Sequence, residues 1–278
     1  MSELAFAEVG ARIYLLTHPV YRVNSVLIDS DDGALVIDTF STPRQAAELL
    51  EAVRRVTAQP LELVNTHFHF DHSFGNFTLA QDGTPIWGHP TCAQELGERG
   101  EHWRRYWQQE IAEEDEELAR EIGEVPLLPP NRLIVHMHEL DLGGRRVILS
   151  HHGRGHTEGD LVVLVGDVLI AGDLVEEGAP PAFEDAYPLE WPDTVAQLLD
   201  LPFTIAIPGH GRVVDRSFVA EQHDELTKLD WLIRDGHADS APAERVVGAS
   251  PLSRKWGEAG RVQSMFAAKR GYAQLDGG

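Results

Sequence analysis

Three histidines and one aspartate lie within the segment THFHFDH, residues 66–72. Residues two apart in an extended segment point the same way, so His67 and His69 can reach one metal ion together. Asp71 and His72 follow directly and can turn toward a second ion. Imidazole and carboxylate groups are the ligands expected for zinc, and they also bind iron and manganese. Because so many polar groups would need partners if they were buried for packing alone, the segment predicts a metal site.

Three later residues share a setting that favours the same role, because each follows a predicted strand and lies close to glycine. They are His156 in GHT, Asp173 in AGD and His210 in PGHG. Glycine allows a close approach of backbone and metal, and loops at strand ends commonly carry functional residues. Each of these residues alone is weak evidence. Together with the first segment they provide seven ligands, which is enough for two adjacent ions.

The elements that must position these ligands are β-rich stretches that alternate with helical ones. Runs rich in Val, Ile and Leu predict strands at 11–17, 24–29, 34–38, 61–65, 86–87, 145–150, 161–165, 168–171 and 203–207. Helical spacing of apolar residues predicts helices that begin at residue 43, with Thr42 as N-cap, and that cover 90–123, 191–199, 218–232 and 262–272. This doubled order indicates two similar halves stacked as helix, sheet, sheet and helix.

The composition narrows the range of partners. The chain of 278 residues has 45 Asp and Glu against 23 Lys and Arg, a formal net charge of −22. This charge opposes binding to phosphate backbones, so we expect a small-molecule substrate and no nucleic-acid partner. A single cysteine, Cys92, excludes an intrachain disulfide and is typical of a reducing cytosol. The apolar run 161–172 contains Gly166 and Asp167 and predicts two strands rather than a membrane span. We expect a cytoplasmic protein without membrane contact. The composition does not tell which oligomeric state the protein has.

The ligand motifs, in their order along the chain, resemble those of the metallo-β-lactamase superfamily of binuclear hydrolases. The resemblance covers residues 11–214 and includes H-x-H-x-D-H, G-H-T, A-G-D and P-G-H-G. It implies an α/β fold, an αββα four-layer sandwich of two mixed β-sheets flanked by helices, with the metals at one edge of the sheets. We accordingly expect a catalytic domain over residues 1–215 and a C-terminal helical extension over 216–278 packed on it.

The resemblance also implies a role for each ligand. The first zinc would be held by His67, His69 and His156. The second zinc would be held by Asp71, His72 and His210, and Asp173 would bridge the two ions. Two adjacent divalent ions lower the pKa of a shared water. The resulting hydroxide, bridging the two zinc ions, would cleave an ester, thioester or lactone of a small molecule. Asp71 would also be the catalytic residue that orients the hydroxide, and iron or manganese could replace zinc.

The type of hydrolase is indicated by one position. Zinc β-lactamases of the superfamily usually have cysteine or serine where Asp173 stands, whereas glyoxalase II, lactonases and phosphodiesterases are similar in having a bridging aspartate. Residues 72–76, HSFGN, look nearer to relay-type hydrolases of poorly defined substrate. Two alternatives stay open: β-lactamase-type amide hydrolysis, and a di-iron redox protein on the same fold. No pattern identifies substrate-binding residues, and Trp103, Tyr106 and Trp107 could form either a helical lid or core.

Overall fold

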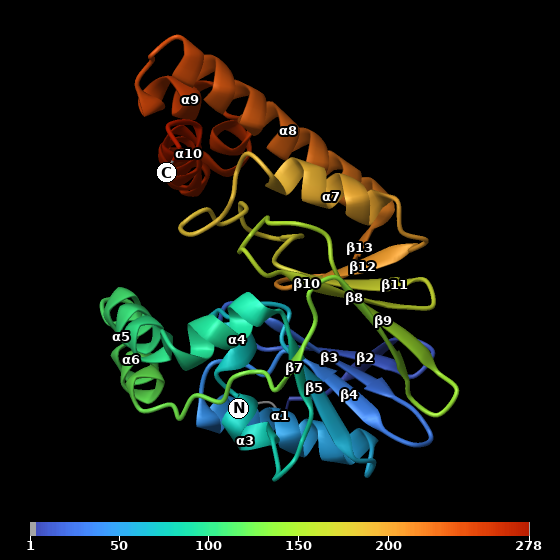
Figure 1. Ribbon diagram of the computed structural model, residues 1–278. Coiled ribbons are helices and arrows are strands. Elements are labelled where there is room, and N and C mark those ends of the chain that lie inside the picture. The colour runs from blue at the N-terminus through green and yellow to red at the C-terminus, as the bar shows by residue number, and fades with distance from the viewer. Residues whose placement is uncertain (1–3, 278) are drawn as a thin grey trace. The chain divides into compact units, whose positions relative to one another are not determined.

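The computed structural model describes residues 4–277 (Figure 1). The chain divides into two compact units. Unit 1 contains the residues up to His151 together with Leu161–Gly166, and unit 2 contains His152–Asp160 and the residues from Asp167 onward. The described strands form two mixed sheets, one of seven strands in the order β1 to β7 and one of six in the order β13-β12-β11-β10-β9-β8. Helices flank these sheets, which confirms the predicted α/β sandwich class.

The seven-stranded sheet of unit 1 is antiparallel from β1 to β4 and parallel from β4 to β7. Its strands are β1 (Ala7–Gly10), β2 (Ile13–Thr17), β3 (Asn24–Asp29), β4 (Ala34–Ile37), β5 (Leu61–Val64), β6 (Ile86–Gly88) and β7 (Arg132–Leu133). Every residue of β3 and β4 is buried, as expected for strands covered on both faces. The predicted strands at 24–29, 34–38 and 61–65 are confirmed to within one residue.

Helix α1 (Pro43–Val56) covers one face of this sheet near β4 and β5 (Figure 1). Its buried residues Ala46, Leu49 and Val53 belong to one apolar cluster with Val36 and Leu63 of the strands. The predicted N-cap is confirmed, because the Thr42 hydroxyl oxygen accepts a hydrogen bond from the backbone N–H of Gln45. This cluster fixes the strands whose ends carry the first ligand segment.

The predicted helical stretch 90–123 differs from the structure, which divides it into three helices. They are α4 (Pro90–Gly97), α5 (Gly100–Ile111) and α6 (Glu116–Gly123). The Asp115 side chain accepts a hydrogen bond from the backbone N–H of Leu118 and begins α6, so this polar residue caps a new helix instead of continuing the old one. The apolar spacing still predicted the packing, because Leu96, Ile111 and Ile122 share one core cluster.

The remaining elements of unit 1 are two short helices and three antiparallel strands. They are α2 (Phe70–Ser73), α3 (Asn76–Leu79), β8 (Met137–Asp141), β9 (Arg146–His151) and β10 (Leu161–Val165). All five residues of β10 are buried. The backbone N–H of Leu161 donates to the carbonyl of Thr66, 2.7 Å away, which attaches β10 to the first ligand segment.

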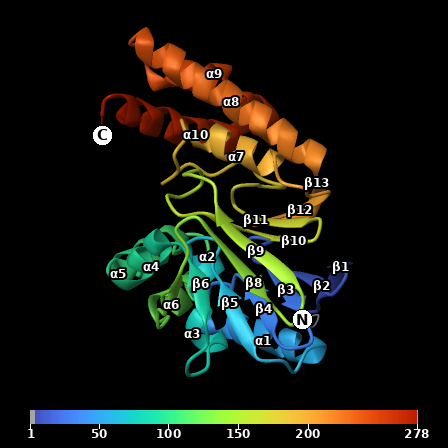
Figure 2. The same cartoon turned by 45° about the vertical axis from the view of Figure 1, so that its right-hand side comes forward.

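Unit 2 contains three strands and four helices within residues 152–160 and 167–277. They are β11 (Val168–Gly172), β12 (Ile205–Pro208), β13 (Val214–Asp215), α7 (Trp191–Leu199), α8 (Arg216–Ala238), α9 (Ala243–Ala249) and α10 (Pro251–Leu275). Strands β11 and β12 are parallel, and α8, α9 and α10 pack together (Figure 2). The predicted domain boundary at residue 215 stays a prediction. Within residues 4–277, no helix has the length and apolar character needed to cross a membrane.

Candidate metal centre

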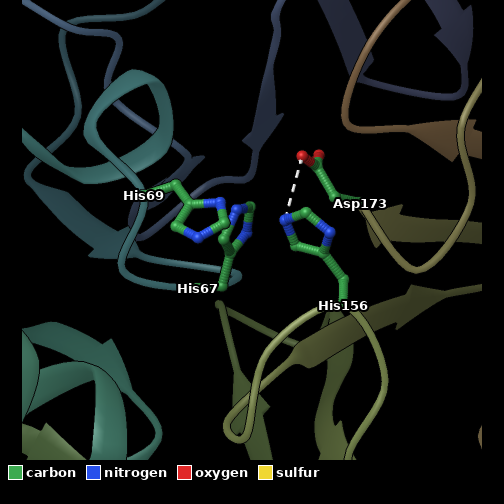
Figure 3. Close-up of side chains that lie close together, drawn as sticks. All are labelled: His67, His69, His156 and Asp173. Carbon is green, nitrogen blue, oxygen red and sulfur yellow. Dashed lines mark ion pairs between the residues drawn. The ribbon is translucent and has the colours of Figure 1, made fainter. Parts of the chain in front are cut away.

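The first ligand segment lies in unit 1, directly after β5. His67 and His69 precede the short helix α2, and Asp71 and His72 lie within it. All four side chains are buried. The ring centroids of His67 and His69 are 4.6 Å apart, as the close-up in Figure 3 illustrates, and those of His67 and His72 are 4.3 Å apart. The structure therefore brings the four predicted ligands of this segment together.

Asp38 determines which ring nitrogen of His67 and of His72 carries the proton. Its Oδ2 lies 2.8 Å from Nδ1 of His72 and accepts a hydrogen bond from the hydroxyl of Thr66, also at 2.8 Å. The Thr66 oxygen lies 3.0 Å from Nδ1 of His67. Because the Thr66 proton goes to Asp38, this oxygen accepts from His67, so both histidines carry their proton on Nδ1. The lone pair of each ring is then on Nε2, the arrangement that suits metal ligation.

Asp38 is a residue that our sequence reasoning did not select. It has a left-handed backbone, φ 62°, which is uncommon outside glycine and persists where surrounding bonds enforce it. Its N–H donates to Val64, and Thr66 donates to its Oδ1 through the backbone. Burial raises the pKa of Asp38, although the charge of His72 and the surrounding hydrogen bonds oppose this shift. A carboxylate at the end of the strand parallel to β5 was the signal that could have found it.

A buried polar network holds the backbone carbonyl of His72. The Asn65 amide donates to the backbone carbonyl of His72 at 3.2 Å and to Oδ1 of Asn76 at 2.9 Å. The hydroxyl of Thr39 also donates to Oδ1 of Asn76. A Cβ atom on Gly75 would overlap the carbonyl oxygen of Thr39. These contacts explain why an asparagine and a glycine follow the histidine-rich segment.

Aromatic side chains cover one side of His69. The Trp107 ring lies 5.5 Å from the His69 ring and 4.9 Å from that of Phe70, and Trp103 packs on Phe68 at 4.8 Å. The sequence left open whether these residues form a lid or core. Trp103 and Trp107 are partly buried and pack against the core cluster of unit 1, which favours the core.

Tyr21 lies at the edge of this aromatic cluster, where its ring meets Phe70 edge-on at 5.9 Å. Burial, together with the negative charges of Glu114 and Asp71, raises the pKa of Tyr21 to about 12. Its hydroxyl is therefore protonated at neutral pH and can donate a hydrogen bond.

Unit 2 contributes the other three predicted ligands. Asp173 directly follows β11 and His210 lies two residues beyond β12, so the carboxyl ends of two parallel strands bring them to the same edge. Oδ2 of Asp173 lies 3.5 Å from Nε2 of His156, the dashed line in Figure 3, and 3.4 Å from Nε2 of His210. A Cβ on Gly209 would overlap Oδ1 of Asp173, so any other residue at this position must displace the carboxylate.

The spacing of these donors suits metal ions. Two ligands at about 2.0–2.1 Å from one tetrahedral zinc lie roughly 3.4 Å apart. The Asp173 separations match this value, and in unit 1 Nε2 of His72 lies 3.7 Å from Oδ2 of Asp71. All of these distances exceed those of ordinary hydrogen bonds. The side chains are nitrogen and oxygen donors, six of them buried and His210 17% exposed. The predicted ligands of unit 1 and those of unit 2 therefore each fit a metal, and the joint seven-ligand centre stays a prediction.

Comparisons with known proteins agree with this chemistry. A family model described as the metallo-beta-lactamase superfamily matches residues 18–210. The metallo-beta-lactamase type 2 of Bacillus cereus is 26% identical over 212 residues, which are 73% of this chain and 72% of that protein. The alpha subunit of a 2,4-dinitroanisole O-demethylase from Nocardioides sp. (strain JS1661) is 22% identical over 77% of this chain and 60% of its own length.

Solved structures show the same fold. A metallo-beta-lactamase from Pontibacter korlensis matches with a TM-score of 0.64 and 20% identity, covering 81% of this chain and 99% of its own. The DIM-1 metallo-beta-lactamase matches with a TM-score of 0.65 and 19% identity, covering 81% of this chain and 98% of its own. The resemblance that the motifs predicted is thus confirmed. With buried histidines and aspartates suited to metal and a family model that matches most of its length, the chain belongs to the metallo-beta-lactamase superfamily, whose members are generally hydrolases.

Proposed function

We propose that this chain is a binuclear metal-dependent hydrolase that cleaves an ester, thioester or lactone of a small molecule. The observation that carries the proposal is the position of Asp173 in unit 2. One of its carboxylate oxygens is within 3.5 Å of Nε2 of both His156 and His210. A ligand shared by two neighbouring divalent cations needs an anionic oxygen, and this oxygen of Asp173 lies close to two imidazole donors.

The proposed centre would hold two ions. One ion would be held by His67, His69 and His156, the other by Asp71, His72 and His210, with Asp173 shared between them. Zinc suits this set of nitrogen and oxygen donors, and iron or manganese could use it as well. The proton positions on His67 and His72 support this assignment, because both rings present Nε2 for ligation.

The chain's own residues would prepare the substrate and the attacking water. Bound divalent ions would supply Lewis acidity, which acidifies a water and polarises the scissile carbonyl. Asp71 would accept a hydrogen bond from the attacking water and orient it. Tyr21, whose hydroxyl keeps its proton, would donate a hydrogen bond to a substrate oxygen. Trp107 and Phe70 would limit the access of bulk water beside His69.

The bond that is cut follows from the leaving group. Ester, thioester and lactone cleavage releases an alkoxide or thiolate, which needs less help from a general acid than a departing amine. A second candidate, β-lactam hydrolysis, is favoured by the 26% identity to a protein named as a type 2 metallo-beta-lactamase. The O-demethylase name of another relative adds aryl methyl ethers to the substrates worth testing. The net charge of −22 and the single cysteine support a small-molecule substrate and a cytoplasmic location.

Elemental analysis of the purified protein, paired with turnover of a thioester, tests the proposal. We expect two divalent ions per chain, and we expect His156→Ala to lose at least one ion and nearly all turnover while the fold survives. The control is His102→Ala, because His102 is an exposed residue of α5, and this variant should retain both ions. If His156→Ala keeps full metal content and full turnover, the ligand assignment is wrong.

A further inference from the structure

The indole of Trp191, in the first turn of α7, contacts both ligand-bearing segments of unit 2. Its side chain is completely buried. The indole N–H donates to the carbonyl of Leu174, 3.2 Å away, and Leu174 directly follows Asp173. The ring also meets that of His156 edge-on, with centroids 5.7 Å apart and planes inclined by 65°. One side chain therefore links the segment of Asp173 to the segment of His156.

The segment that carries His156 is attached to α7 along its backbone. The hydroxyl of Thr194 donates to the carbonyl of Arg154 at 2.7 Å, and the amide of Gln197 donates to the carbonyl of His152 at 2.8 Å. Just before the helix, the backbone N–H of Tyr187 donates to the carbonyl of Gly155 at 2.8 Å. Three of the four backbone carbonyls of residues 152–155 thus accept hydrogen bonds from α7 or from Tyr187 before it. The position of α7 therefore determines the position of this segment.

Close packing leaves the indole little freedom to move. A Cβ on Gly155 would lie 3.2 Å from Cδ1 of Trp191 and would overlap the side chain of Leu174. On another side, the buried Phe183 ring packs on the indole with centroids 5.1 Å apart. The carbonyl of Leu174 is held a second time by the amide of Gln222 on α8, at 2.8 Å. A shift of the indole would therefore displace both ligand segments.

We propose that Trp191 is a positioning residue that fixes His156 and Asp173 relative to each other and thereby sets the metal affinity of the site. This inference rests on the proposed function, since it assumes that both residues ligate metal. Groups that orient metal ligands typically change metal affinity by about 10–100-fold when they are removed. The indole differs from the usual hydrogen-bonding partner because it acts on one ligand through ring packing and on the other through a neighbouring carbonyl.

Cobalt(II) binding tests this role without depending on turnover. The dissociation constant is measured by competition with a chelator, and the visible absorption of the cobalt protein reports ligand geometry. We expect Trp191→Leu, which loses the ring and the N–H, to weaken cobalt binding by about tenfold or more and to change the spectrum. Trp191→Phe keeps a ring beside His156 but not the bond to Leu174, so its effect should be smaller and in the same direction.

Phe203→Leu provides the matched control for lost packing. Phe203 is a buried aromatic of the same unit that precedes β12, at the end of this strand opposite to His210, and its ring faces Arg216. We expect this variant to lose stability in urea with less than about a twofold change in cobalt affinity.

The outcomes distinguish the positioning role of Trp191 from the proposed function. If Trp191→Leu loses only as much stability as Phe203→Leu, with an unchanged affinity and spectrum, the positioning role is overturned. If Trp191→Leu does not fold, Trp191→Phe decides: a weakened affinity supports the role and a wild-type affinity overturns it. A wild-type protein that binds no cobalt would instead refute the proposed function, and this inference with it.

Discussion

Nδ1 of His72 lies 2.8 Å from the carboxylate of Asp38, a residue that is itself no predicted ligand. The same carboxylate oxygen receives the proton of the Thr66 hydroxyl, which in turn faces His67. One buried aspartate thus determines the tautomer of two candidate ligands from the end of β4.

This relationship predicts the effect of Asp38→Asn. The asparagine amide can present an N–H to Nδ1 of His72, which would move the imidazole proton to Nε2 and block ligation. We expect metal affinity to fall by about 10–100-fold, measured by chelator competition. Asp29→Asn is the control, because Asp29 is a buried aspartate of β3 that pairs with Arg12. Equal metal affinities in the two variants would contradict the role of Asp38.

Gly209 predicts a purely steric effect on Asp173. A Cβ at this position would overlap Oδ1 of the aspartate, so Gly209→Ala must displace the carboxylate. We expect at least about a tenfold loss of metal affinity in a protein that still folds. The control is Gly248→Ala in α9, where a Cβ meets no atom within 4 Å. Isothermal titration with zinc compares the two, and a Gly209→Ala protein that binds like the control would show that the site tolerates this shift.

His89 predicts how the stability of unit 1 depends on pH. Burial, with the neighbouring His151 and His136, lowers the pKa of His89 from 6.5 to about 4. Between these values the unfolded chain holds a proton that the folded chain does not. The stability contribution is therefore fully present above about pH 6.5 and declines as the pH falls toward 4. The ring is only partly buried, so solvent reduces the size of the effect.

His89→Asn isolates this titration from the capping role of the residue. His89 accepts a hydrogen bond from the backbone N–H of Thr91 as the N-cap of α4, and asparagine is an equally good cap. Urea unfolding of the metal-free protein is measured from pH 4.5 to 7.5. We expect the stability difference between variant and wild type to shift in favour of the variant as the pH falls. A difference that is constant with pH would rule His89 out, and His102→Asn on α5 serves as the control.

The sequence predicted the buried strands better than the edges of the sheets. β10 and α7 have the predicted limits, because a continuous apolar run and a regular apolar spacing are local signals. β8 was missed because four of its five residues are exposed and its sequence MHELD has no strand pattern of its own. It becomes a strand by pairing with β9, a contact that no local rule contains.

The same distinction applies to the candidate site. The seven predicted ligands could be selected because their residue types and spacings carry the chemistry directly. Asp38 and Trp191 act through contacts with residues distant in sequence, His72 in one case and Leu174 with His156 in the other. A carboxylate after a strand and a tryptophan at the start of a helix are common for other reasons. Their roles therefore required the tertiary structure.

The last prediction concerns the bond that is cut. Asp173 supplies a carboxylate between two histidines, and we identify no group in the ligand segments placed to protonate a departing amine. Ester, thioester and lactone turnover should therefore exceed β-lactam turnover by at least about tenfold in kcat/KM, equivalent to roughly 1.4 kcal/mol in the barrier. One zinc-loaded preparation is assayed with a thioester, a lactone, a cephalosporin and 2,4-dinitroanisole, and Asp71→Asn shows how much of each rate depends on the proposed centre. The largest loss is expected for the preferred substrate, because Asp71 would orient its attacking water. A cephalosporin rate equal to or above the thioester and lactone rates would make β-lactam hydrolysis the better assignment, in keeping with the relative from Bacillus cereus.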